Sequence, residues 1–274
     1  MTIVERVERS PDFAPHERYY WRYQFLLGEQ VLVPLMRSWG LFAPGIRVFE
    51  FGCGEAGVLG AFAHAGASWA VGADISDYRI DVGRRVAAAC GLSLELERRD
   101  LLSEPIPPAW RAGFDLVLMR DVIEHLDDTE HALAVVEMLL ARGGAMLVTF
   151  PPYLSPFGGH QHLLQTRLGS LPWVHLVPPR LFAWIVRQSK RPADQEEVRR
   201  LREIALTIGK FERALARSSS IEIVHKQLYL LRPVFRFKFG LPSLKLPRVL
   251  WRTPLAELLA LEALYVLRPV AQRV

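Results

Sequence analysis

The most informative residues stand at the end of a short apolar run, where an acidic side chain precedes a glycine-rich turn. Glu50 is followed by Gly52, Gly54 and Gly57, and Asp74 ends the next apolar run. Taken alone, this glycine spacing fits a dinucleotide site, in which the second acid binds a ribose. A carboxylate has two acceptor oxygens and can therefore bind both hydroxyls of a ribose. The pattern indicates a nucleoside-containing ligand at a strand end.

The acids around this turn argue against a pyrophosphate. A helix N-terminus attracts an anion with only about half an elementary charge, and here Glu50 and Glu55 bracket the loop. A ligand that carries a sulfonium and a free ammonium group suits this place better than two phosphates. The same acids make a nicotinamide-dependent oxidoreductase a disfavoured alternative.

A second group of residues could perform proton or metal chemistry. Asp121, Glu124 and His125 have the spacing i, i+3 and i+4, which predicts one face of a helical turn. His160 and His162 are two apart, and in an extended segment they would point the same way. Such a set can hold a divalent metal, or a histidine can remove a proton from a hydroxyl. The third possibility is that His125 is only a hydrogen-bonded structural residue.

Alternating apolar strands and helical segments from 46 to 151 must position these residues. The alternation is typical of a parallel sheet covered on both faces, whose ligands bind at the carboxyl ends of the strands. The expected strands are 46–51, 69–74, 93–98, 114–119 and 145–150, and the expected helices are 56–65, 77–90 and 128–141.

The flanking segments complete the expected architecture. Residues 1–45 are predicted to form a helical cap, with a helix from Glu17 to Trp39 whose aromatic residues pack or close a ligand pocket. Residues 151–218 are too long for an ordinary connection, contain a charged helix at 193–216, and are expected to form a substrate lid. The aromatic residues meant in the cap helix are Tyr19, Tyr20, Trp21 and Tyr23.

After the insertion, two further strands are expected, at 221–231 and 262–268.

Together, these segments resemble the class I S-adenosylmethionine-dependent methyltransferases. The first motif of that family, an acid followed by G-x-G-x-G, is matched by Glu50-Phe51-Gly52-Cys53-Gly54, with Ala56 where the third glycine often stands. The resemblance assigns the ribose to Asp74 and the adenine amine to Asp100. It implies S-adenosylmethionine as cofactor, bound by Glu50, Gly52, Cys53, Gly54, Asp74, Ile75, Asp100, Leu101 and Arg120.

The resemblance also implies a fold and its division into domains. We expect an α/β, doubly wound, mostly parallel seven-stranded Rossmann-like sheet with an N-terminal helical cap and a long insertion after strand five. The expected domains are the cap at 1–45 and a methyltransferase domain at 46–274, with the insertion 151–218 as its lid.

Two subgroups of this family, the ubiquinone-biosynthesis O-methyltransferases and the small-RNA 2′-O-methyltransferases, carry a Glu-x-x-Glu-His that holds a divalent metal. Here Asp121 replaces the first glutamate. The resemblance implies Asp121, Glu124 and His125 as metal ligands, and His160 of the insertion is expected to complete the set. Zinc is less demanding of such a set than magnesium. The catalytic candidates are His160, His162 and His125.

Composition restricts the acceptor and the compartment. The chain has 274 residues, a net charge of +5 and only two cysteines, which predicts a cytoplasmic protein without a disulfide framework. No apolar run is long enough to cross a bilayer. The segment 226–252 has basic but no acidic residues and is interleaved with aliphatic ones, which favours a small or lipid-like acceptor and a peripheral membrane contact. RNA 2′-O-methylation and a non-catalytic methyltransferase-like binding protein are the alternatives.

Overall fold

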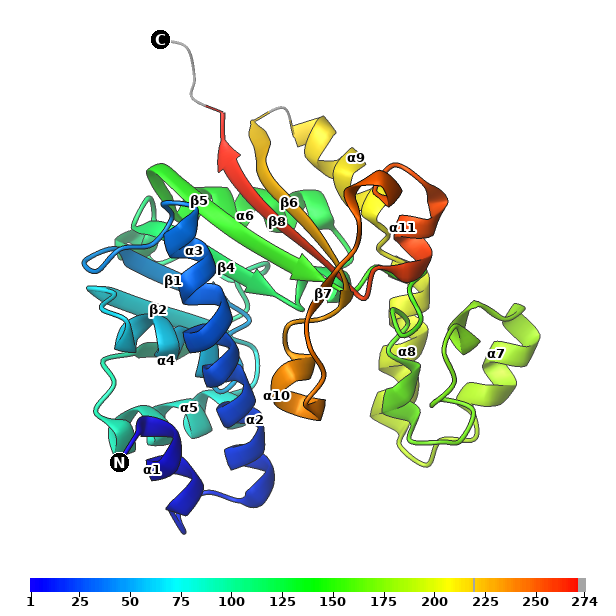
Figure 1. Ribbon diagram of the computed structural model, residues 1–274, viewed down its shortest axis with the longest axis horizontal. Helices are drawn as coiled ribbons and strands as arrows, with labels where there is room; N and C mark the ends of the chain where they lie inside the picture. The colour runs from blue at the N-terminus through cyan, green and yellow to red at the C-terminus, as the bar shows by residue number, and fades with distance from the viewer. Residues whose placement is uncertain (219, 271–274) are drawn as a thin grey trace.

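The computed structural model describes residues 1–218 and 220–270. In that part of the chain the strands form an eight-stranded sheet in the order β3-β2-β1-β4-β5-β8-β6-β7 (Figure 1). The strands are β1 (Arg47–Phe51), β2 (Trp69–Asp74), β3 (Glu95–Arg98), β4 (Phe114–Arg120), β5 (Leu140–Phe150), β6 (Ile221–Leu231), β7 (Leu244–Lys245) and β8 (Glu262–Pro269).

The sheet is mixed but mostly parallel. Strands β1 to β5 pair in parallel, whereas β8 is antiparallel to both β5 and β6. The predicted doubly wound, Rossmann-like class is confirmed, and the eighth strand is the two-residue β7 at the edge, antiparallel to β6. Because β1 and β4 are neighbours from which the chain proceeds in opposite directions, the residues after their carboxyl ends flank the crevice where such sheets bind ligands.

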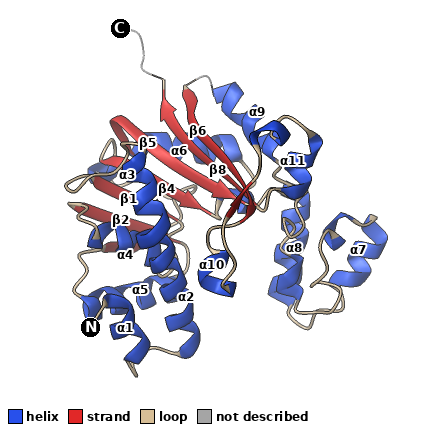
Figure 2. Ribbon diagram, in the orientation of Figure 1, coloured by secondary structure: helices blue, strands red, loops and turns tan. Residues whose placement is uncertain are grey.

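Helices cover both faces of the sheet (Figure 2). On one face α2, α3 and α4 pack against Val48, Leu116 and Leu147, and on the other face α6 and α9 pack against Phe49 and Val117. The helices are α1 (Ile3–Arg9), α2 (Pro15–Leu27), α3 (Val33–Ser38), α4 (Gly57–His64), α5 (Asp77–Cys90), α6 (Thr129–Leu139), α7 (Pro179–Val186), α8 (Pro192–Ile204), α9 (Ile208–Ser218), α10 (Phe235–Phe239) and α11 (Pro254–Leu259). None of the described helices is long and apolar enough to cross a membrane.

The N-terminal segment is helical, as predicted, and is integrated into the core. A five-residue π-helix, Gly28–Leu32, joins α2 to α3. Trp21 and Tyr23 are buried, whereas Tyr19 and Tyr20 remain exposed. The aromatic residues of α2 therefore divide between packing and an exposed surface.

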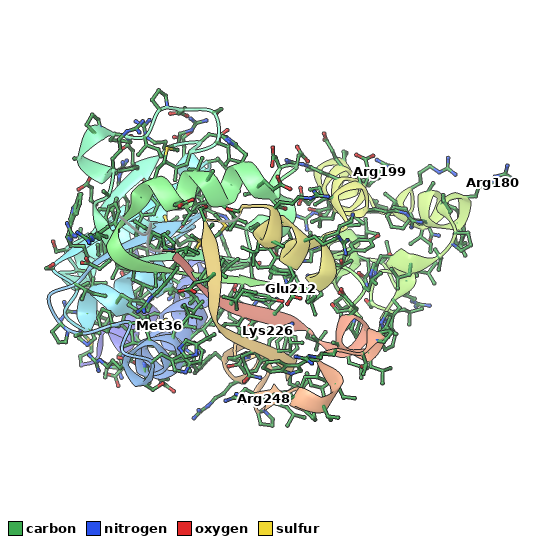
Figure 3. All side chains as sticks on the ribbon, turned by 90° about the horizontal axis from the view of Figure 1, so that it is seen from above. Met36, Arg180, Arg199, Glu212, Lys226 and Arg248 are labelled. Atoms are coloured by element: carbon green, nitrogen blue, oxygen red, sulfur yellow. The ribbon has the colours of Figure 1, made fainter. Side chains whose placement is uncertain are left out.

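The insertion differs from its prediction in one respect. The single charged helix expected at 193–216 is two helices, α8 and α9, because the chain turns at Ala205, whose φ is 43°. Helix α9 joins the core of the sheet, where the rings of Phe211 and Phe150 lie 5.0 Å apart. Helices α7 and α8 share a separate small core and project from the sheet, as the labelled Arg180 and Arg199 show in Figure 3.

The segment after β6 is not extended. Strand β6 ends at Leu231, before the residues in which Phe alternates with basic side chains. The chain turns at Pro233 and forms the short helix α10.

Gly57 sets the distance between α4 and α2, and we expect its replacement by alanine to lower the free energy of unfolding by about 1–3 kcal/mol. A Cβ at this position would lie 2.8 Å from the carbonyl oxygen of Trp21 and 2.7 Å from Cβ of Gln24. Urea unfolding of Gly57→Ala would measure the loss. Gly209→Ala is the control, since its Cβ would meet only flexible side-chain atoms, the nearest at 3.3 Å. Equal stability of the two variants would contradict the expectation.

Candidate active site

The glycine turn after β1 brings the end of β2 and the turn after β4 together. Gly52 has a φ of 69°, and a Cβ there would lie 2.4 Å from Cγ2 of Val122, so only glycine fits. Ala56 also adopts the left-handed region, at φ 58°, immediately before α4. The turn therefore keeps its shape although alanine replaces the third glycine of the motif.

Asp74 is held in place by this turn. Its Oδ2 accepts a hydrogen bond from the backbone N–H of Gly54 at 2.8 Å, and its Oδ1 accepts one from Ser76 at 2.9 Å. Each oxygen keeps a second acceptor position, because a carboxylate oxygen can accept two hydrogen bonds. Asp74 faces a cavity of about 500 Å³ and retains the acceptor capacity that two hydroxyls need.

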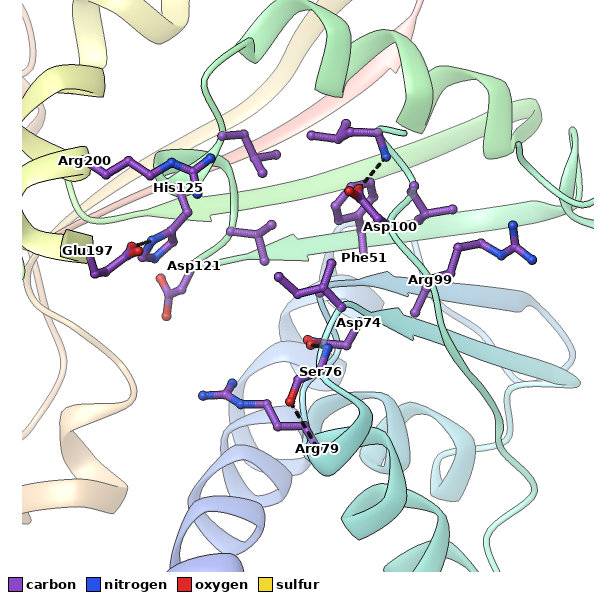
Figure 4. A pocket seen from close by; sticks show the side chains of 17 residues that line it. Phe51, Asp74, Ser76, Arg79, Arg99, Asp100, Asp121, His125, Glu197 and Arg200 are labelled. Atoms are coloured by element: carbon purple, nitrogen blue, oxygen red, sulfur yellow. Dashed lines mark hydrogen bonds and ion pairs between the residues drawn. The ribbon is translucent and has the colours of Figure 1, made fainter. Parts of the chain in front are cut away.

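Two neighbouring cavities share Gly52, Arg79 and Asp121. The larger one extends from Asp74 to the side chain of His125 (Figure 4), and the smaller one, of about 110 Å³, lies beside the glycine turn. All nine residues expected to bind the cofactor line one cavity or the other, which brings residues of four strand ends together. Gly52, Asp74, Ile75, Asp100 and Leu101 line the larger cavity, and Glu50, Gly52, Cys53, Gly54 and Arg120 line the smaller.

Asp100 is bound within its own turn. Its carboxylate accepts hydrogen bonds from the N–H of Leu102 at 3.0 Å and from Oγ of Ser103 at 2.8 Å. The bond from Ser103 is the main cause that lowers the pKa of Asp100. The residue is an oriented anion at the far end of the larger cavity.

The smaller cavity is lined by a buried glutamate and a buried arginine. Glu50 accepts a hydrogen bond from the N–H of Leu59 at 3.0 Å, and burial raises its pKa to about 7. Arg120 donates to Oε1 of Gln24 on α2 at 3.0 Å, and its Nε has no partner in the described residues. A carboxylate and a guanidinium in one cavity suit a ligand that has both an ammonium and a carboxylate group.

Asp121 was predicted to share one face of a helical turn with Glu124 and His125, and this prediction is wrong. Asp121 has a φ of 53° and precedes the 3-10 turn Ile123–His125, so the three side chains do not lie on one α-helical face. Both of its oxygens lie 2.6 Å from Nη2 of Arg232 on the chain after β6. Burial alone would raise the pKa of Asp121, but Arg232 and Arg120 outweigh it and lower that pKa to about 2.

Glu124, His125 and His160 form a compact cluster, with one candidate ligand atom of each within 4.8 Å of the others. Glu124 is buried, and neither of its carboxylate oxygens has a hydrogen-bond partner among the described residues. Burial, with a contribution from Asp121, raises the pKa of Glu124 to about 8. Burial and the neighbouring histidines lower the pKa of His160 to about 3, which keeps its imidazole neutral. Two unpartnered carboxylate oxygens beside a neutral imidazole fit a divalent cation.

His125 has the surroundings of an oriented base or ligand. Its Nδ1 contacts Glu197 of α8, and its Nε2 lies 3.8 Å from Oε1 of Glu124. Burial opposes protonation, but Glu197 and Glu124 outweigh it and raise the pKa of His125. Glu197 thereby fixes which nitrogen faces the cluster.

His162 lies outside the cluster. The prediction that this segment is extended is wrong, because His160 is in the left-handed region and His162 lies in the 3-10 turn Gln161–Leu164. The centroids of the two rings are 5.8 Å apart. Only His160 joins Glu124 and His125.

Several residues of the site escaped the sequence analysis. Glu197 belongs to a charged helix whose composition resembles a solvated surface, and Gln24 and Arg232 come from segments far from the motifs. No local spacing marks them, because their contacts are made only by the tertiary fold.

Comparison with known proteins agrees with this geometry. Residues 49–146 match the family model described as a methyltransferase domain. A ubiquinone biosynthesis O-methyltransferase of Ruegeria sp. (strain TM1040) is 28% identical over 56% of this chain and 63% of that protein. One of Rhizobium etli (strain CIAT 652) is 34% identical over 38% of this chain and 40% of that protein. The chain thus spans less than two thirds of these relatives.

The fold has counterparts among solved structures. Magnesium protoporphyrin IX methyltransferase from Synechocystis PCC 6803, solved with bound SAH, has a TM-score of 0.52 and 14% identity, over 98% of this chain and 93% of that chain. The chain therefore contains a class I S-adenosylmethionine-dependent methyltransferase domain. Within that class it is distantly similar to the ubiquinone biosynthesis O-methyltransferases.

Proposed function

We propose that this protein transfers a methyl group from S-adenosylmethionine to a hydroxyl oxygen of a small or lipid-like acceptor. The observation that carries the proposal is the cluster of Glu124, His125 and His160, because its member His125 lines the same cavity as Asp74. Methyl transfer from a sulfonium depends mainly on holding the acceptor in line with the leaving sulfur. A hydroxyl acceptor must in addition lose a proton, and the cluster is placed to assist that step.

The residues present have distinct roles in this proposal. Glu124, His125 and His160 would hold a divalent cation, which would lower the pKa of a hydroxyl bound to it. A carboxylate with two imidazoles suits zinc better than magnesium. Asp121 was also expected as a ligand, but its carboxylate is paired with Arg232 and does not belong to the cluster. Without a cation, His125 is the better base of the three histidines, because Glu197 raises its pKa while the pKa of His160 is about 3.

The lobe of α7 and α8 is proposed to act as the lid over the acceptor. Glu197 and Arg200 of α8 line the larger cavity, and Arg200 binds Asp127 at 3.1 Å next to the 3-10 turn of His125. The lid is therefore the middle of the insertion, up to Ile204, since α9 belongs to the helical layer of the sheet.

The basic segment 226–252 supports a small or lipid-like acceptor over RNA. Two of its cations are directed inward, since Lys226 binds Glu212 and Arg232 binds Asp121. Phe235 and Phe237 pack against the core, whereas Phe239, Leu241 and Leu244 are exposed. A stacking platform for bases would need those rings free. The exposed apolar residues with basic neighbours are consistent with a peripheral membrane contact.

Calorimetry with S-adenosylmethionine tests the proposal, and we expect the affinity to rise about tenfold from pH 5.5 to 7. Burial raises the pKa of Glu50 to about 7, so the empty protein loses stability from this group as the pH rises towards 7. A cationic ligand needs the ionised form and therefore binds more weakly at acidic pH. Glu50→Gln should bind weakly at both pH values. No binding below millimolar concentration would exclude the enzyme and leave a non-catalytic binding protein.

A further inference from the structure

Helix α10 places one cation beside the proposed active site. Phe235 and Phe237 are partly buried against the core that contains Tyr23, which seats the helix against α2. Figure 1 shows α10 between α2 and α8, below the carboxyl end of β5 and the beginning of β8. Nζ of Lys238 lies 4.3 Å from the centroid of the Tyr23 ring. The ammonium group thus lies over the ring of a buried tyrosine.

Lys238 has no hydrogen bond or ion pair with any residue in 1–218 and 220–270. The charged groups near it are Arg120 at the end of β4, Asp121 after it, Arg232 after β6 and, from the insertion, His162. Asp121 is the acid among them, and Arg232 already holds both of its oxygens at 2.6 Å. A part-buried ammonium is therefore left beside two guanidinium groups without an anion of its own.

The electrostatics around Lys238 favour the arrival of an anion. Burial and Arg232 lower the pKa of Lys238 to about 8, and Lys238 in turn helps to lower the pKa of His162. A desolvated ammonium costs free energy unless it is paired, so an anionic ligand would gain from this position. The ring of Tyr23 supplies a cation–π contact but no negative charge.

The cofactor does not need this cation. The smaller cavity already contains Arg120, whose Nε is unpartnered in the described residues, beside Gln24 and Glu50. Lys238 instead neighbours His162, which lies on the insertion next to His160 of the proposed catalytic cluster. This places the ammonium on the acceptor side.

We propose that Lys238 binds an anionic group, a carboxylate or a phosphate, on a hydroxylated methyl acceptor. The inference rests on the proposed function and names the acceptor class: the hydroxyl meets the cluster of Glu124, His125 and His160, and the acidic group meets Lys238 against the Tyr23 ring. Attachment at two points orients the hydroxyl, which is how binding energy assists a transfer reaction.

The test measures binding of 3,4-dihydroxybenzoate and of catechol to the full-length protein saturated with S-adenosylhomocysteine. Wild-type protein is expected to bind the carboxylate at least about tenfold more tightly, a difference of about 1.4 kcal/mol. Lys238→Met should abolish that preference without changing the affinity for catechol or for S-adenosylhomocysteine, and Lys238→Arg should retain part of it. Arg236→Gln, an exposed cation on the same helix, is the matched control and should change nothing.

Competition by benzoate and by inorganic phosphate then distinguishes the two acidic groups. Equal affinity of the wild-type protein for the two probes, or binding of neither, would overturn the inference. A loss of S-adenosylhomocysteine affinity in Lys238→Met would overturn it as well, by assigning the ammonium to the cofactor. Failure of the wild-type protein to bind S-adenosylhomocysteine would instead refute the proposed function itself, so the two failures are distinguishable.

Discussion

Replacement of His125 by alanine is expected to lower turnover by about 10²–10⁴-fold while cofactor affinity stays nearly unchanged. His125 borders the larger cavity, Glu197 orients one of its nitrogens, and the other faces the unpartnered oxygens of Glu124. As ligand or as base, it therefore acts on the acceptor rather than on the cofactor. Turnover is measured as release of S-adenosylhomocysteine with a hydroxylated aromatic acceptor, and cofactor affinity by calorimetry.

Asp127→Asn is the matched control for this experiment. Asp127 is exposed and binds Arg200 of α8. Its replacement therefore weakens another contact between this turn and α8 without changing a residue of the cluster. A comparable loss of turnover in Asp127→Asn would assign the effect to the position of α8. Unchanged turnover in His125→Ala would contradict both roles of the histidine.

Treatment with a chelator distinguishes a metal-dependent reaction from one in which a histidine is the general base. If Glu124 is a ligand, Glu124→Ala should also abolish turnover, and a chelator should do so reversibly, with activity restored by added zinc. Full activity in excess chelator would exclude the metal and leave His125, oriented by Glu197, as the base. In that case the pH–rate profile should move in His125→Ala but not in His160→Ala, because burial keeps the pKa of His160 at about 3.

The proposed cofactor end of the site could be predicted because its residues lie in or next to strand ends. A parallel sheet gathers the carboxyl ends of its strands at one edge, so Gly52, Asp74 and Asp100 come together once the strands are recognised. The hydrogen bond from the N–H of Ser76 to Asp74 is also local, whereas the one from Gly54 forms when the ends of β1 and β2 meet. Alternation of apolar runs was sufficient to place these residues at one cavity.

The acceptor end could not be predicted in the same way. Glu197 reaches His125 from 72 positions away, and Arg232 reaches Asp121 from 111 positions away. No short-range spacing encodes such contacts, because they depend on how the insertion and β6 fold back. The turn after β4 also misled the periodicity argument, since Asp121 takes a left-handed conformation that an i, i+3, i+4 pattern does not anticipate.

The ion pairs of Arg232 join the two ends of the site, and Arg232→Met is expected to lower the free energy of unfolding by about 3 kcal/mol at pH 7.5. Its Nη2 binds both oxygens of Asp121, and its Nε binds Oε2 of the buried Glu262 at 2.9 Å. Methionine fills the space but deprives Glu262 of its ion pair and leaves Asp121 only the more distant Arg120, at 4.0 Å.

The pH dependence of Arg232→Met identifies the mechanism. The ion pair lowers the pKa of Asp121 to about 2, so its stabilisation is present above the ordinary pKa of aspartate and disappears as the pH falls towards 2. In the variant both carboxylates are more easily protonated, and the loss of unfolding free energy measured with urea should shrink between pH 7.5 and 4.

Arg217→Met is the control: it breaks the exposed ion pair with Glu130 and should lower the free energy of unfolding by at most about 1 kcal/mol. A deficit in Arg232→Met that is no larger than this, or that does not change with pH, would show that Arg232 contributes packing rather than charge. Because Asp121 lines both cavities, the same variant should also bind S-adenosylmethionine more weakly.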